Sequence, residues 1–230
     1  MRPCSVSRSN LDPIKSIAFR RRCRLPLWLA FLLLTACGDD GPRLPVLSPD
    51  ASIIAFGDSL TSGVGAAPGQ DYPSQLARLT GFRVTNAGVP MEVSAEGLAR
   101  LPALLDENPA NLLILIHGGN DFLRNLPQEQ TAANLTAMIA AARSRGISVV
   151  MLGVPRPALF GLSSAEFYDE LAESTGTPID GETLPAILSD NSLKSDLVHP
   201  NDEGYRRLAE ATASLLRASG AWSGTVYSND

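Results

Sequence analysis

The sequence predicts an α/β protein, a three-layer α/β/α sandwich built around a mostly parallel five-stranded sheet. Two observations support this prediction. Short apolar runs alternate along the chain with segments in which apolar residues recur at helical spacing. The sequence also contains no repeat of 20 to 50 residues and no low-complexity tract, either of which would indicate a different architecture. Such alternation is typical of a parallel sheet covered by helices on both faces, with the functional site outside the carboxyl ends of the strands.

The elements follow one another in a regular order. Each expected strand is a short apolar run with the composition of a buried strand. These runs are Ser52–Phe56, Phe82–Thr85, Leu112–Ile116, Ile147–Leu152 and a weaker one at Pro178–Asp180. The expected helices lie between and after them. They are Tyr72–Leu79, Ala95–Leu105, Glu129–Arg143, Ser164–Glu173 and Glu203–Arg217.

The N-terminus has the pattern of a secretory signal. A basic stretch at 20–24 precedes the apolar run Leu25–Leu34, which has the length of a signal-peptide core and is too short to span a bilayer. Residues 34–37, Leu-Thr-Ala-Cys, resemble a bacterial lipobox. The resemblance implies cleavage before Cys37, a lipid on its sulfur, and a membrane-anchored lipoprotein of the cell envelope facing the periplasm or the outer face. A plain secretory signal with an incidental Cys37 is the alternative.

Four segments follow from this pattern. We expect a signal peptide at 1–36, a flexible tether at 37–50, a single folded domain at 51–220 and a tail at 221–230. Removal of the signal peptide would leave 12 Lys and Arg against 23 Asp and Glu, a net charge of −11, which argues against a nucleic-acid partner. No thiol would remain for a disulfide or a thiolate metal site. We expect a monomer.

The first candidate for chemistry is Ser59. It follows the first expected strand within Gly57-Asp58-Ser59-Leu60, so it stands at the carboxyl end of that strand. The glycine permits a sharp turn, and a helix beginning here would present N–H groups to a developing oxyanion. A serine that only caps a helix is the alternative.

The second candidate is the pair Asp196 and His199, just before the last expected helix. At a separation of three residues the carboxylate can accept a hydrogen bond from the imidazole Nδ1, which leaves Nε2 free to deprotonate a serine. A helix-capping aspartate with an unrelated surface histidine is the alternative. The chain has one other histidine, His117, which we interpret as structural.

The third candidate is Asn120, in the run His117-Gly118-Gly119-Asn120-Asp121 that follows the expected strand Leu112–Ile116. The glycines permit close backbone approach, and the Asn amide can donate to an oxyanion. A simple glycine-rich turn is the alternative. The three candidates stand at one edge of the predicted sheet, which favours one shared site.

These three motifs resemble three of the four signature blocks of the SGNH (GDSL) hydrolases, in particular the bacterial lysophospholipases, acyl-thioesterases and arylesterases. The stretch 97–102, Gly-Leu-Ala-Arg-Leu-Pro, also resembles that subgroup. The resemblance covers about 53–216. It implies a flavodoxin-like SGNH hydrolase fold and an enzyme that cleaves carboxylic esters or thioesters through an acyl-enzyme, with no cofactor and no metal.

The resemblance also implies the role of each residue. Ser59 is the nucleophile, His199 the base and Asp196 its orienter, while the Ser59 N–H, the Asn120 amide and an N–H of the remaining block hold the oxyanion. In that block the subgroup carries Gly-Asp-Thr where this sequence has Met91-Glu92-Val93. Met91 can donate its backbone N–H if its φ and ψ allow. A shift that lets Gly88 serve instead is the alternative.

Asp58 and Asp121 stand beside the reacting residues, and we expect their side chains to hold loops. A two-metal site formed by them is the disfavoured alternative, because the chain has few histidines. Apolar residues after Asn120 (Phe122, Leu123, Leu126) and the stretch 154–160 suggest a groove for a small or lipid-like ester, or simply loop packing. The competing functions are an acetylesterase acting on envelope polysaccharide and a catalytically inert, ligand-binding lipoprotein.

Overall fold

The computed structural model describes residues 41–158, 161–164 and 166–224. Its centre is a five-stranded sheet in the order β2-β1-β3-β4-β7, in which every pair of neighbours is parallel. The strands, in chain order, are β1 (Ser52–Gly57), β2 (Arg83–Gly88), β3 (Leu112–Ile116), β4 (Ser148–Leu152) and β7 (Ile179–Asp180). The predicted α/β fold with a parallel five-stranded sheet is therefore confirmed.

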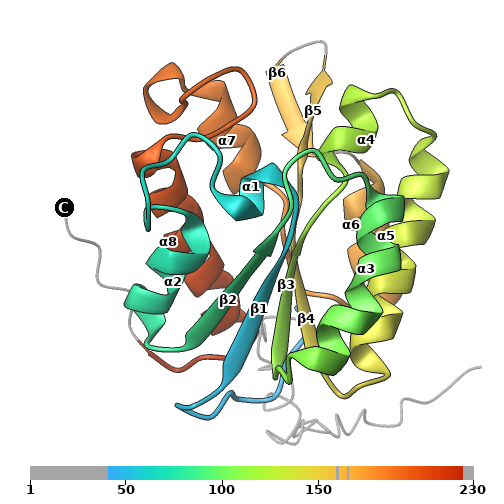
Figure 1. Ribbon diagram of the computed structural model, residues 1–230, viewed down its shortest axis with the longest axis vertical. Coiled ribbons are helices and arrows are strands. Elements are labelled where there is room, and N and C mark those ends of the chain that lie inside the picture. Colours follow the sequence, from blue (N-terminus) through green and yellow to red (C-terminus); the bar gives the residue numbers. More distant parts are fainter. Residues whose placement is uncertain (1–40, 159–160, 165, 225–230) are drawn as a thin grey trace, which may run out of the picture. The chain divides into compact units, whose positions relative to one another are not determined.

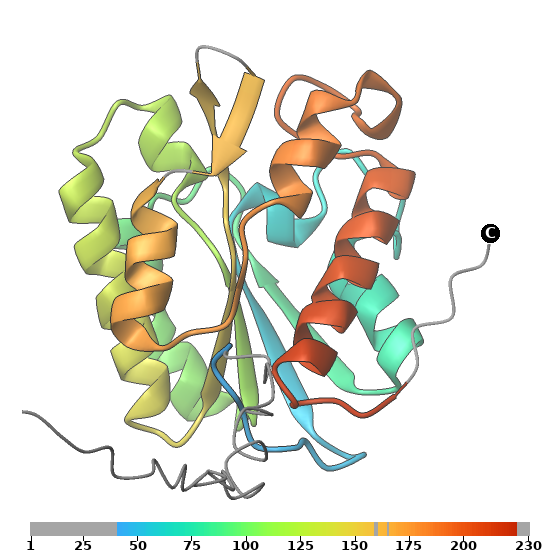
Figure 2. The ribbon, with the colours of Figure 1, turned by 180° about the vertical axis from the view of Figure 1, so that it is seen from behind.

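Helices cover both faces of the sheet (Figure 1). One face carries α3 (Ser94–Glu107), α5 (Gln128–Arg143) and α6 (Glu166–Thr175), and the other carries α2 (Tyr72–Thr80) and α8 (Asp202–Ala218). Figure 2 shows the same two layers from behind. Each predicted helix agrees with one of these within about two residues at either end. The chain thus forms the three layers that the alternating pattern predicts.

The sheet core is almost completely buried. All five residues of β3 are buried, and so are Ile53 to Gly57 of β1, because both strands lie between two layers of helices. Strand β2 differs from the prediction of a buried strand, since all six of its residues are exposed or half-buried. It is an edge strand, with β1 on one side only.

The helix α1 (Ser59–Ser62) begins where the sequence suggested a helix N-terminus. Several other short elements were not predicted. These are the helices α4 (Gly119–Leu123) and α7 (Thr183–Ser189), the 3₁₀ helix η1 (Asn191–Leu193), and the antiparallel pair β5 (Pro155–Ala158) and β6 (Gly161–Ser164). Each is too short to show a helical or strand period in the sequence. Most of them gather around the carboxyl ends of the strands, above the sheet in Figure 1.

The segment before β1 lies against the domain. The N–H groups of Leu44 and Leu47 donate to the carbonyls of Ser219 and Ala221 at 2.8 Å, and both leucine side chains pack on the core. The expected flexible tether at 37–50 is therefore shorter than predicted, because two apolar side chains fix its second half. The expected signal peptide, Cys37 and residues 225–230 of the expected tail at 221–230 lie outside the described residues. In the described part of that tail, Ala221 is buried and Trp222 packs on the core, so the domain extends beyond 220. Within the part of the chain that is described, no helix has both the length and the apolarity that crossing a membrane requires.

Candidate active site

The nucleophile candidate Ser59 begins the single-turn helix α1, directly beyond β1. Asp58 caps this turn, and its carboxylate accepts a hydrogen bond from the Leu60 N–H at 3.0 Å. Gly57 precedes it at a point where β1 and β3 approach closely: a Cβ there would lie 2.0 Å from the Ile116 carbonyl oxygen. Glycine is therefore required at this position, and the tight connection directs Ser59 away from the sheet edge.

Three predicted residues form a continuous hydrogen-bonded chain. The Ser59 hydroxyl lies 2.9 Å from His199 Nε2, and Asp196 Oδ2 lies 2.8 Å from His199 Nδ1. Because a carboxylate can only accept, the proton resides on Nδ1 and the Nε2 lone pair faces the serine. This is the arrangement in which an imidazole can remove a serine proton.

The loop that carries Asp196 and His199 is held by its own backbone. The second carboxylate oxygen of Asp196 accepts hydrogen bonds from the N–H groups of Val198 at 2.8 Å and His199 at 2.9 Å. Burial alone would raise the pKa of Asp196, but the hydrogen bonds from His199 and Val198 outweigh it and lower that pKa. The carboxylate therefore stays charged and oriented over a wide pH range.

Asn120 lies in α4, beyond β3, and its side-chain amide points at two acceptors. The amide nitrogen lies 3.0 Å from the Glu92 carbonyl oxygen and 3.3 Å from Asp58 Oδ2. The first contact fixes the amide plane against the loop that follows β2. The second is long, so the hydrogen that makes it is the one that an incoming oxyanion can take most easily.

Met91 has a left-handed backbone, with φ of 67°, and its side chain is 69% exposed. Its carbonyl accepts a hydrogen bond from Arg124 at 2.8 Å. No described residue accepts a hydrogen bond from the Met91 or Ser59 N–H. The alternative donor Gly88 is less suitable, because its N–H is engaged by the Asn86 side chain at 3.0 Å.

Asp58 and Asp121 are both buried, and their carboxylates accept hydrogen bonds from residues of the surrounding helices. Asp121 accepts hydrogen bonds from the Ser94 N–H at 2.8 Å, the Ser94 hydroxyl at 2.5 Å and the Thr131 hydroxyl at 3.1 Å. These contacts join α4 to the helices α3 and α5. Burial raises the pKa of Asp58. The described residues contain no group of three or more His, Cys, Asp and Glu that could hold a metal ion.

The triad opens into a pocket of about 620 Å³ at the carboxyl end of the sheet. Ser59, His199 and Asn120 line it together with mainly apolar side chains. Those apolar residues are Leu60, Val64, Pro90, Met91, Phe122, Leu123, Val154, Pro155, Leu188, Leu197 and Val198. Of the residues expected to form a groove, Phe122 and Leu123 line this pocket, whereas Leu126 lines a smaller neighbouring one.

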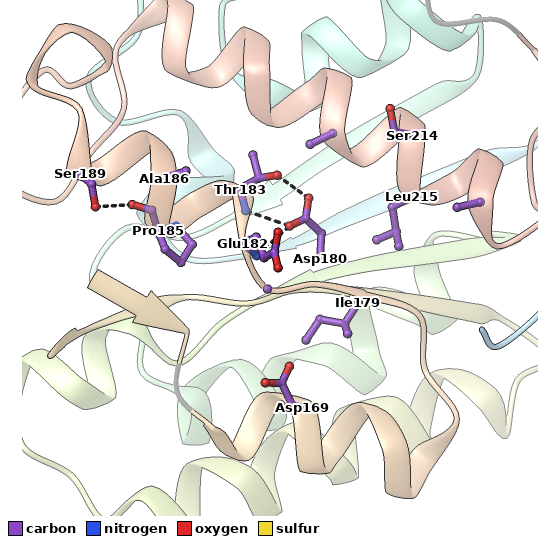
Figure 3. A pocket seen from close by; sticks show the side chains of 13 residues that line it. Asp169, Ile179, Asp180, Glu182, Thr183, Pro185, Ala186, Ser189, Ser214 and Leu215 are labelled. Carbon is purple, nitrogen blue, oxygen red and sulfur yellow. Dashed lines mark hydrogen bonds between the residues drawn. The ribbon is translucent and has the colours of Figure 1, made fainter. Parts of the chain in front are cut away.

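A second, larger pocket of about 1,080 Å³ lies beside the edge strand β7 (Figure 3). It is lined by residues of α6, α7 and α8 and includes the carboxylates Asp169, Asp180 and Glu182. In Figure 3 the Asp180 side chain turns toward Thr183, whose N–H and hydroxyl donate to it at 2.9 and 2.6 Å. None of the residues singled out in the sequence lies in this pocket.

One group next to the site was not singled out as functional in the sequence. Glu92, adjacent to Met91, is buried and hydrogen-bonds both Arg100 and His117. Burial alone would raise its pKa, but the hydrogen bonds from Arg100 and His117 outweigh it and lower the pKa to about 2. The available signal was weak: an acidic residue beside Met91 and an arginine in the stretch 97–102.

Comparison with known proteins agrees with this geometry. The model of the GDSL-like lipase/acylhydrolase family matches residues 55–207. The chain is 30% identical over 199 residues to esterase TesA of Pseudomonas aeruginosa, covering 81% of this chain and 97% of that protein. It is 26% identical over 173 residues to thioesterase 1/protease 1/lysophospholipase L1 of Escherichia coli K12, covering 72% of this chain and 83% of that one.

Solved structures show the same fold. The crystal structure of TesA superposes with a TM-score of 0.67 at 29% identity, over 73% of this chain and 99% of that one. AlinE4, an SGNH-hydrolase family esterase, superposes with a TM-score of 0.58 at 31% identity, over 74% and 97%. The chain therefore belongs to the GDSL-like lipase/acylhydrolase family of SGNH hydrolases, in the subgroup of esterases and thioesterases that includes TesA.

Proposed function

We propose that this protein is a serine hydrolase that cleaves carboxylic esters or thioesters with an apolar acyl group. The observation that carries the proposal is the chain from Asp196 through His199 to Ser59, with contacts of 2.8 and 2.9 Å, at the wall of a mainly apolar pocket. A positioned imidazole is what a serine hydroxyl needs to act as a nucleophile near neutral pH.

The reaction proceeds in two halves. His199 Nε2 takes the Ser59 proton as the serine oxygen attacks the carbonyl carbon, and then gives that proton to the departing alcohol or thiol. In the second half, the same nitrogen takes a proton from water as the water oxygen attacks the acyl carbon, and it then gives that proton to the Ser59 oxygen as the acid is released. Asp196 accepts from Nδ1 throughout and stabilises the imidazolium that forms in each half.

The negative charge on the carbonyl oxygen needs donors at fixed positions. The Ser59 N–H, the Met91 N–H and the Asn120 amide are the three candidates, and the first two have no acceptor among the described residues. Asn120 serves by moving one hydrogen from its long contact with Asp58 to the oxyanion, while the other stays on the Glu92 carbonyl.

The surface around the pocket favours an acyl chain over an acetyl group. Four large apolar side chains in the described part of the chain are more than 60% exposed, and three of them line this pocket: Leu197 at 87%, Met91 at 69% and Leu123 at 61%. Exposed apolar groups clustered around a site are typical of binding surfaces. Relatives named as lysophospholipase and thioesterase agree with such a substrate.

The test is hydrolysis of p-nitrophenyl esters of rising chain length by a chain that begins at Asp40. A start at Ser48 would remove Leu44 and Leu47, which pack on the domain. We expect turnover that rises from acetyl to longer chains, and loss of turnover in Ser59→Ala. Ser74→Ala is the matched control, because the Ser74 hydroxyl, in α2, donates to the capping residue Asp71 and has no contact with the triad.

Two other outcomes would replace the proposal. Turnover that is highest on acetyl esters and falls with chain length would identify an acetylesterase. No turnover of any ester or thioester, together with failure of a fluorophosphonate to label Ser59, would identify an inert binding protein. Labelling of wild type but not of Ser59→Ala supports the hydrolase.

We also propose that Cys37 carries a lipid and anchors the enzyme in the bacterial cell envelope. The lipobox-like residues 34–37 after a basic and an apolar stretch support it. Metabolic labelling with a fatty-acid analogue should mark the full chain and not Cys37→Ser. A wild-type chain that takes up no label would leave a plain secretory signal in its place.

A further inference from the structure

Two of the three proposed oxyanion donors come from separate segments beyond the sheet. Met91 lies in the loop that follows β2, and Asn120 lies at the start of α4, which follows β3. These strands are not neighbours, because β1 lies between them in the sheet. The distance between the two donors therefore depends on contacts beyond the sheet edge, where no ladder of backbone hydrogen bonds holds the loops together.

Glu92 makes those contacts with both its backbone carbonyl and its side-chain carboxylate. Its carbonyl oxygen accepts the Asn120 amide at 3.0 Å. Its carboxylate accepts from His117 Nε2 at 3.1 Å, three residues before Asn120 in the same β3–α4 connection. One residue, adjacent to Met91 in the chain, thus bonds the second loop at two places.

Arg100 fixes the same carboxylate from the opposite side. Its Nε and a terminal nitrogen lie 2.8 and 2.7 Å from the two oxygens of Glu92. The guanidinium also donates to the Ala87 carbonyl at 3.1 Å and lies 4.2 Å above the Phe56 ring. Since Ala87 is in β2 and Phe56 in β1, this arginine ties Glu92 to the rigid sheet.

The protonation of His117 follows from its neighbours. The Gly118 N–H donates to Nδ1 at 3.1 Å, so the ring proton resides on Nε2 and points at Glu92. Both nitrogens are occupied and the ring is buried. His117 therefore serves Glu92 as a donor and has no lone pair available for chemistry.

We propose that Glu92 is a positioning residue that sets the distance between the Met91 N–H and the Asn120 amide through its ion pair with Arg100 and its bond to His117. This inference rests on the proposed function. In Glu92→Gln, the amide NH₂ would replace a carboxylate oxygen that accepts N–H groups of Arg100 or His117. Two donors would then face each other, and their repulsion should move the two loops apart. Small displacements of groups that stabilise a transition state are costly to the rate.

The experiment compares Glu92→Gln with Asp106→Asn, which removes the exposed ion pair of Asp106 with Arg145 on the far part of α3. We expect kcat for an ester to fall about ten- to a hundredfold in Glu92→Gln. KM should change less than about threefold in the same variant, which is about the spread in the net free-energy contribution of a single hydrogen bond. Affinity for an alkyl trifluoromethyl ketone, which forms an oxyanion on the serine, should fall in parallel with kcat. Asp106→Asn should leave all three unchanged.

A double-mutant cycle with Asn120→Ala separates positioning from general damage. If Glu92 acts through the oxyanion donors, Glu92→Gln should lower kcat by a much smaller factor in the Asn120→Ala background than in wild type. Equal costs in both backgrounds would overturn the proposal, as would unchanged kcat in a folded Glu92→Gln. Assays run well below the melting temperature of each variant keep loss of folding out of the comparison.

The outcomes also separate this proposal from the proposed function. A wild type with no Ser59-dependent hydrolysis removes the function itself. A wild type that hydrolyses esters through Ser59, with Glu92→Gln as active as wild type, removes only the role of Glu92.

Discussion

Both histidines of the chain hydrogen-bond a carboxylate: His199 bonds Asp196 at 2.8 Å, and His117 bonds Glu92 at 3.1 Å. The two pairs differ in which imidazole nitrogen hydrogen-bonds the carboxylate and in what the second nitrogen contacts. Asp196 takes Nδ1 of His199, and Nε2 faces the Ser59 hydroxyl. Glu92 takes Nε2 of His117, and Nδ1 accepts a backbone N–H. A histidine–carboxylate pair is thus a base only when its second nitrogen reaches a proton to remove.

The two pairs also differ in how exposed their carboxylates are and in what else those carboxylates bond. Asp196 is about half exposed and its carboxylate hydrogen-bonds only Val198 and His199 of its own loop, so the pair lies on an open rim where substrate can arrive. Glu92 is 6% exposed and also bonds Arg100, so its pair is part of the packed interior. An interior pair can fix distances, whereas a rim pair can exchange protons with substrate and water.

The greatest loss of activity is expected when the histidine beside Ser59 is replaced. His199→Gln should lower kcat for ester hydrolysis by at least about 10³-fold, because no other base in the described part of the chain contacts the Ser59 hydroxyl. His117→Gln should lower it by less than about tenfold, since the glutamine amide can still donate to Glu92. Steady-state kinetics on the two folded variants measure both. Equal losses would mean that His117 takes part in proton transfer.

The next effect is the contribution of Glu92 to the pH dependence of stability. Its pKa is lowered to about 2 by the hydrogen bonds that outweigh burial, below the ordinary value of 4.5. The ionised carboxylate therefore stabilises the fold fully above about pH 5, and this contribution is lost as the pH falls toward 2. Wild type should exceed Glu92→Gln by about 3 kcal/mol in free energy of unfolding at pH 7.

Urea unfolding at several pH values checks this. The difference between wild type and Glu92→Gln should be constant from pH 7 to 5 and shrink below pH 4.5. Asp106→Asn provides the contrast, because Asp106 is exposed and solvent screens its ion pair, so this substitution should change the free energy of unfolding little at any pH. A difference that persists undiminished at pH 3 would show that the ion pair is not its source.

The smallest effect concerns the left-handed backbone of Met91, the residue before Glu92. Met91→Gly should stabilise the fold by about 1 kcal/mol, because glycine adopts a φ of 67° without the strain that a side chain brings. Its kcat should stay within a few-fold of wild type, since the proposed donor is the backbone N–H. Thermal unfolding measures the gain. Asn125→Gly, at φ of 53°, should gain less, because asparagine tolerates this conformation.

Much of the fold could be predicted because it depends on local pattern. The strand Leu112–Ile116 was predicted at its exact limits, and α2, α3, α5 and α8 within two residues, since apolar periodicity is written into consecutive residues. Short elements such as α7 and the β5–β6 pair were missed. Their conformation is imposed by the elements they pack against rather than by their own composition.

From the sequence we could predict which residues meet at the carboxyl edge of the sheet. Ser59, Asp196, His199 and Asn120 follow strand ends or precede a helix, and parallel strands bring such ends to one edge. How Glu92, Arg100 and His117 combine is visible only in the folded protein, because they come from three segments and nothing in their local sequence specifies a partner. A buried charge needs partners with exact geometry, and that geometry exists only once the sheet and both helical layers have packed together.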